Sequence, residues 1–261
     1  MISIGSAPFF GSVFGILIGL LGGAGSVLTV PFLIYVSGYD IRVAISLSLA
    51  MVSVGAAVGA FMQFRTGGVR VKSGVFIGLL SFLGAVPGVW LNHASGEHLF
   101  LVLFGVMMAV VGLVMTQMKL RSSISPAAAP TGEAYLLENW PFLLILSIAV
   151  GLVTGYFGVG GGFLVIPALL WGGHLPAYQA MGTSLLVIVI SSLFSLVRHI
   201  SLISIDAGLV LLLGCGAGIG TFLGMKLLKW IPGYTLSKVY GSVLIVAGLL
   251  LIIQNIRGIM P

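Results

Sequence analysis

The chain has 261 residues, of which 59% are hydrophobic and only 6% are charged, and its mean hydropathy is +1.24. Soluble domains carry about 25% charged residues, so this composition excludes a soluble fold and predicts an all-α polytopic membrane protein. The net charge of +6 does not indicate nucleic acid here, because the Lys and Arg residues lie in short loops and at helix ends, where they orient membrane helices.

The first apolar stretch, residues 9–37, has an awkward length for a membrane segment. Its 29 residues would form a helix about 43 Å long, too long for one untilted crossing of a core about 30 Å thick and too short for two. A glycine-rich run at residues 22–26 and Pro31 interrupt it. We therefore expect two half-helices that meet at an unwound break.

Six further apolar stretches are long enough for single crossings, which need about 20 residues each. Three follow the first broken stretch. The other three follow a second broken stretch at residues 141–171, which is interrupted by glycines at 158–162 and by Pro167. The six predicted crossings are residues 41–64, 73–91, 98–118, 178–199, 206–229 and 236–256.

A polar connector separates the two sets of stretches. It contains two prolines and the acids Glu133 and Glu138, a composition typical of a solvent-exposed linker. The predicted organisation is a first transmembrane repeat at residues 1–118, a polar linker at 119–139 and a second transmembrane repeat at 140–261.

A fixed offset of 136 residues aligns the two halves without a gap. The matches include glycines in both breaks and the proline after each, Pro31 and Pro167, and they continue to Gly112 and Gly248. Chance matches are common in a chain with 39 glycines, but one offset kept over this length indicates a duplication. Duplicated halves are the usual construction of secondary transporters.

The charges bear on whether the two halves are parallel or inverted. The loop after the first full crossing holds Arg65, Arg70 and Lys72, whereas its counterpart holds Arg198 and Asp206. If each broken stretch is re-entrant, the halves are inverted and the cations divide 8 to 3 between the two sides; if each crosses, they divide 7 to 4. The positive-inside rule favours inverted repeats, each with one broken or re-entrant helix and three transmembrane helices, and places both termini in the periplasm.

The paired breaks are the strongest functional signal. Unwound backbone at membrane depth is tolerated where it is buried in protein or lines a wet cavity, and the N-terminus of a half-helix suits an anion. Tight helix packing is the alternative, but two clusters at equivalent positions favour binding. The predicted substrate-binding backbone comprises Gly22, Gly23, Gly25, Ser26, Gly160, Gly161 and Gly162.

Hydroxyl side chains lie early in the helix that follows each break. They either donate to a bound anion or bond back to the carbonyl four residues earlier, and the sequence leaves both alternatives open. The candidates are Ser46, Ser48, Thr183 and Ser184.

Gln63 and His199 occupy equivalent positions near the ends of equivalent helices. Histidine titrates near neutral pH, and an ionisable group inside a membrane is a functional hypothesis by default. Gln63, His199 and the neighbouring Arg198 are therefore candidates for coupling or gating. The alternative is that they only anchor the helix ends at the membrane interface.

Signatures of enzymes are missing from the chain. It has no Gly-x-Ser-x-Gly, His-Glu-x-x-His or Walker A motif, and Cys215 is its one cysteine. We therefore predict no catalytic residue, no metal site and no cofactor.

The two breaks resemble those of the TauE/SafE sulfite exporter family of permeases. The resemblance rests on residues 19–31 and 155–167, on residues 180–185, and on the position of His199. It covers almost the whole chain. It implies transport of sulfite, sulfoacetate, sulfonates or related sulfur-containing anions.

The first half departs from this pattern. Ala24 and Ser26 replace glycines of the second copy, and Gln63 replaces the histidine, so the two half-sites are expected to be unequal. We expect a secondary transporter of a small sulfur-containing anion in a bacterial inner membrane, with a proton or sodium ion for coupling. A passive anion channel or facilitator is the alternative, and a homodimer is left open.

Overall fold

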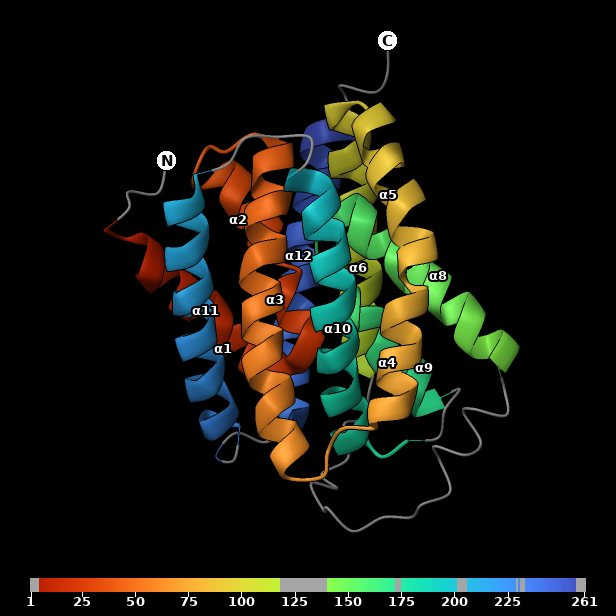
Figure 1. Ribbon diagram of the computed structural model, residues 1–261. Helices are drawn as coiled ribbons and strands as arrows, with labels where there is room; N and C mark the ends of the chain where they lie inside the picture. Colours follow the sequence, from red (N-terminus) through yellow and green to blue (C-terminus); the bar gives the residue numbers. More distant parts are fainter. Residues whose placement is uncertain are drawn as a thin grey trace.

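The computed structural model describes residues 5–117, 140–171, 175–200, 206–228, 230 and 233–256. All regular elements in these ranges are helices, gathered in one bundle (Figure 1). They are α1 (Ala7–Leu21), η1 (Gly22–Ser26), α2 (Thr29–Tyr35), α3 (Ile41–Arg65), α4 (Val71–Leu80), α5 (Phe82–Ala94), α6 (Glu97–Gln117), α8 (Trp140–Phe157), α9 (Gly162–Trp171), α10 (Ala177–Ile200), α11 (Ala207–Leu227) and α12 (Gly233–Asn255). The predicted linker at 119–139 lies outside the described residues.

Eight helical segments in the described ranges are long and apolar enough to cross a membrane. The prediction of an all-α polytopic membrane protein is therefore confirmed. The predicted crossing at residues 73–91 lies within one helical span, Val71–Ala94, in which the single turn residue Ser81 separates α4 from α5. The hydroxyl of Ser81 donates to the carbonyl of Gly78, a local bond that bends helices.

The chain reverses direction at the first break. The ring of Phe32 in α2 lies 5.3 Å from that of Phe10 and 4.9 Å from that of Phe14 in α1, so α2 packs back along α1. In the second half, Val165 of α9 and Val150 of α8 share one buried cluster. Each broken stretch thus contains two unequal helices, and the first break is a 3-10 turn where the sequence predicted unwound backbone.

Two pairs of helices at equivalent positions, α6 with α12 and α3 with α10, run antiparallel to one another. A Cβ placed on Gly105 of α6 would lie 2.7 Å from the carbonyl oxygen of Gly248 in α12, and a Cβ on Gly112 would lie 2.5 Å from that of Gly241. The offset of 136 residues pairs these glycines in the opposite order. Likewise, a Cβ placed on Gly59 late in α3 would lie 3.0 Å from the Cδ1 of Leu185 early in α10, and these two helices lie side by side (Figure 1).

Candidate functional site

The two glycine-rich breaks meet inside the bundle. A Cβ placed on Gly23 would lie 2.6 Å from the Cα of Gly162, and a Cβ on Gly162 would lie 2.7 Å from the Cα of Gly23. Residues 22–26 and 158–163 are all buried. Only hydrogen fits between the backbones at this point, so these two glycines allow the half-sites to touch.

The second break leaves the helical conformation. Gly158, Gly160 and Gly161 have φ of 71°, 74° and 65°, in the left-handed region that glycine adopts without strain. In the first break only Gly22 has a positive φ, of 62°. The two half-sites therefore differ in backbone shape, as their sequences predicted.

Hydroxyls from the first half reach the carbonyls of the second break. The Oγ of Ser26 lies 2.8 Å from the carbonyl oxygen of Gly23 and 2.5 Å from that of Val159. The Oγ of Ser48 donates to the carbonyl of Gly158 at 2.9 Å. Ser26 thus bonds to both breaks and Ser48 to the second break, and a bound anion would compete for their protons.

The remaining predicted hydroxyls have other partners. Ser46 donates to the carbonyl of Arg42 at 3.0 Å and Ser184 to that of Met181 at 2.7 Å, both within their own helix. The Oγ1 of Thr183 accepts from the backbone N–H of Arg70 at 3.0 Å. Back-bonding, the alternative left open by the sequence, thus describes Ser46 and Ser184, whereas Ser48 points at a break.

Gln63 and His199 lie at opposite ends of the antiparallel pair α3 and α10. Both side chains are buried, with 2% and 0% exposed. The Nε2 of His199 lies 3.0 Å from the carbonyl oxygen of Gly155, three residues before the second break. Arg198 is exposed, so the structure separates it from the buried imidazole beside it. Burial argues against an anchoring role at the interface for His199.

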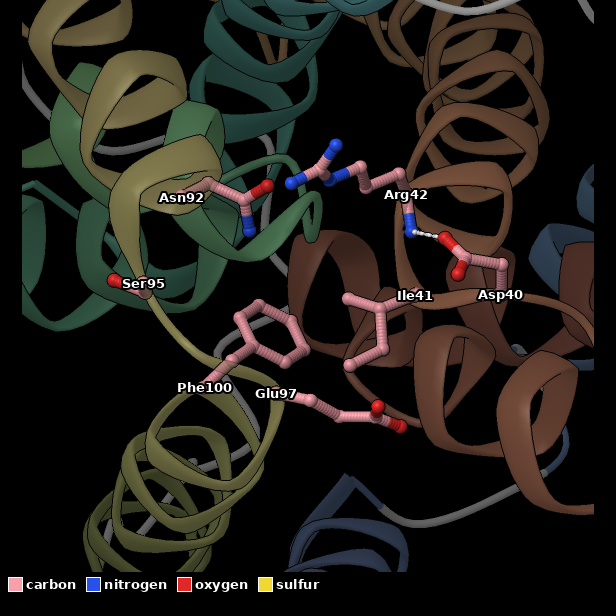
Figure 2. A pocket seen from close by; sticks show the side chains of 7 residues that line it. All are labelled: Asp40, Ile41, Arg42, Asn92, Ser95, Glu97 and Phe100. Atoms are coloured by element: carbon pink, nitrogen blue, oxygen red, sulfur yellow. Dashed lines mark hydrogen bonds between the residues drawn. The ribbon is translucent and has the colours of Figure 1, made fainter.

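A small polar pocket lies near the C-terminal end of α10, and the sequence did not predict it. Its volume is about 180 Å³. Figure 2 shows the guanidinium of Arg42 and the amide of Asn92 pointing toward one another, and Asn92 Nδ2 donates to the carbonyl of Tyr156 at 2.9 Å. The lining residues are Asp40, Ile41, Arg42, Asn92, Ser95, Glu97 and Phe100.

His93 connects the pocket to His199. Arg42 Nη2 lies 3.5 Å from the carbonyl oxygen of His93, and the rings of His93 and His199 are 5.8 Å apart. The one sign of this pocket in the sequence is the pair Asn92-His93 at the end of an apolar stretch. Such a pair is equally typical of a surface loop. No cluster of three or more His, Cys, Asp or Glu in the described part of the chain has the arrangement of a metal site.

The helical bundle, the paired breaks and the buried polar groups between them define a multi-pass membrane transporter. The model of the family "Sulfite exporter TauE/SafE" matches residues 7–251, and the chain belongs to this family. Relatives have similar lengths and similar names. A "Probable membrane transporter protein" of Xylella fastidiosa strain Temecula1 is 32% identical over 260 residues, which cover 97% of this chain and 94% of the relative.

More distant relatives come from other groups of prokaryotes. The "Probable membrane transporter protein YunE" of Bacillus subtilis is 27% identical over 264 residues, covering 94% of this chain and 96% of the relative. A "Probable membrane transporter protein" of Methanocaldococcus jannaschii is 25% identical over 197 residues, which cover 73% of this chain and 70% of the relative. No solved structure matches the chain significantly.

Proposed function

We propose that this transporter is a secondary permease for a small sulfur-containing anion, such as sulfite, sulfoacetate or another organosulfonate. The observation that carries the proposal is the contact of the two breaks at Gly23 and Gly162. It brings the backbone amides and hydroxyls of both halves to one buried place. The name of the matched family supports the class of substrate.

Backbone N–H groups and hydroxyls, rather than side-chain charges, hold the anion in this proposal. Among the described residues, no Lys, Arg, Asp or Glu is buried. The hydroxyls of Ser26 and Ser48 turn from the break carbonyls to the anion when it binds. Their hydrogen bonds to a charged ligand are stronger than those to a carbonyl, so the exchange favours the bound state.

A screen of ligands tests the substrate class. Sulfite, sulfoacetate, taurine and sulfate are added separately to the purified protein, and binding is followed by calorimetry and by thermal stabilisation. We expect saturable binding of sulfite or a sulfonate, and weaker binding after Ser48→Ala. Binding of none of the sulfur anions, by a protein that remains monodisperse, would contradict the proposal.

The two halves are inverted repeats in this proposal, with the linker in the cytoplasm and both termini outside the inner membrane. The antiparallel pairs α3 with α10 and α6 with α12 support the inversion, and the division of charges supports the orientation. A reporter that is active only outside the inner membrane is expected to be active when fused at Pro261. A reporter that is active only in the cytoplasm is expected to be active when fused in the 126–130 stretch. A cytoplasmic C-terminus would overturn the orientation.

The proposed coupling ion is a proton bound by His199. Protonation puts a positive charge near the second break, so anion and proton bind together, and each raises the affinity for the other by the same factor. The ionisable groups around His199 are His93 of α5 and, at the pocket, Arg42, Asp40 and Glu97. Sodium coupling is the alternative.

Anion affinity, measured between about pH 5.5 and 8, is expected to fall as the pH rises, because the proton and the anion bind together in this proposal. In His199→Gln, which introduces the residue found at the equivalent position Gln63, the slope should flatten. The affinity for sulfite is measured by calorimetry at each pH, and His93→Gln serves as the comparison for the neighbouring ring. Equal slopes in the wild type and His199→Gln would exclude His199 as the coupling group.

A further inference from the structure

One face of α10 carries three buried polar atoms without a hydrogen-bond partner in the described part of the chain. They are Ser192 Oγ, Ser195 Oγ and His199 Nδ1, and all three side chains are 0% exposed. Spacings of three and four residues place them on the same side of the helix. Buried polar groups are nearly always satisfied in proteins, so a row of three suits a polar ligand.

This row leads from the second break to the pocket at Arg42. At one end, Ser192 Oγ would lie 3.2 Å from a Cβ on Gly160. At the other, His199 faces His93, whose Nε2 also lacks a partner among the described residues. Beyond His93, Asn92 lines the pocket, and its Oδ1 also lacks a hydrogen-bond partner among the described residues.

The duplication accounts for the third position of this row, where Gln63 Oε1 also lacks a partner among the described residues, but not for the two serines. The offset of 136 residues places Ala56, Gly59 and Gln63 of α3 at the equivalent positions. Ala56 is fully buried in an apolar cluster with residues of α1 and α10. The second half therefore carries serines where the first half carries small apolar residues, although both positions lie inside the membrane-spanning part.

We propose that this face of α10 is the route by which the anion travels between the pocket and the breaks, and that the pocket binds it first. The inference rests on the proposed function and adds its path. Arg42 and the second N–H of the Asn92 amide supply donors for an oxyanion, and the serine hydroxyls and the protonated imidazole of His199 continue the row of donors inward. At the mouth, the carboxylates of Asp40 and Glu97 favour singly charged over doubly charged anions.

Cysteine accessibility tests the route without requiring transport. Ser192→Cys, Ser195→Cys and the matched control Ala56→Cys are made in a Cys215→Ser protein, because Cys215 is exposed. Each is treated with 2-sulfonatoethyl methanethiosulfonate, a membrane-impermeant sulfonate. We expect both serine positions to react about tenfold faster than Ala56→Cys, and Arg42→Gln to slow them, as expected when a charged hydrogen bond is lost. Equal rates at Ser195→Cys and Ala56→Cys would overturn the route.

A second measurement applies if a cysteine variant does not fold. Sulfite flux into proteoliposomes is compared for Ser195→Ala and Ser147→Ala; the hydroxyl of Ser147 is buried but already donates to Leu143 at 2.6 Å. The route predicts a loss of flux in Ser195→Ala alone, and an equal flux in both variants would contradict it. Selective labelling at the serines without sulfite flux in the wild type would contradict the proposed function and leave the route standing.

Discussion

Replacing Gly162 with alanine is expected to lower anion transport by about tenfold or more, because displacements of about an ångström in a binding site have effects of this size. A Cβ at this position would lie 2.7 Å from the Cα of Gly23, closer than two carbon atoms approach without bonding. Gly162 does not have a positive φ, so alanine leaves the local backbone unstrained and acts by displacing the side chain of Ile188 and separating the breaks. Gly23→Ala should have the same effect.

The control for this prediction is Gly96→Ala. Gly96 lies between α5 and α6 with no atom within 4 Å of an added Cβ, so this variant should transport normally. Initial rates of sulfite uptake into proteoliposomes are compared at equal protein content, after gel filtration has shown that each variant is monodisperse. Normal transport by a monodisperse Gly162→Ala would show that contact between the breaks is not part of the site.

Alanine at Gly220 is expected to lower the free energy of unfolding by about 1–3 kcal/mol, the usual cost of overpacking. Gly220 of α11 faces α1, where an added Cβ would collide with the carbonyl group of Ser12. Helices in lipid associate through such close approaches of small residues. A backbone carbonyl cannot turn aside as a flexible side chain does, so the two helices must separate.

Gly218→Ala provides a matched comparison on the same helix. Its added Cβ would meet only Val54 and Val58, each at 3.4 Å, an ordinary contact distance. Both substitutions gain the same helix propensity, about 1 kcal/mol, so the difference between them measures packing alone. Unfolding is followed in mixed micelles of detergent and dodecyl sulfate. If both variants were equally stable, the contact between α1 and α11 would not be as close as described.

The helices themselves were predictable from the sequence. In lipid, each crossing segment must satisfy its own backbone hydrogen bonds and be about 20 residues long, so the length of an apolar run nearly determines the helix. The predicted crossings at 41–64 and 178–199 became α3 (Ile41–Arg65) and α10 (Ala177–Ile200). The predicted crossing at 73–91 lies within the span Val71–Ala94, and only the turn residue Ser81 inside it was not predicted, because one local hydrogen bond leaves no trace in hydropathy.

The candidate site was predictable only in part. Repetition marked both breaks, but their contact through Gly23 and Gly162 depends on how distant segments pack. The hydroxyl of Ser48 crosses to a break while that of Ser46 bonds within its helix, and no pattern distinguishes two serines two residues apart. The pocket at Arg42 was not predicted because its lining residues come from separate parts of the chain.

Uphill transport of sulfite in proteoliposomes tests the central proposal most directly. The purified protein is reconstituted, the membrane potential is clamped at zero, and a proton gradient or a sodium gradient is imposed across the membrane. A secondary transporter should accumulate sulfite above the external concentration under the proton gradient, and lose this accumulation when the gradient is collapsed. Equilibration of sulfite without accumulation under either gradient would contradict secondary transport and identify a passive facilitator.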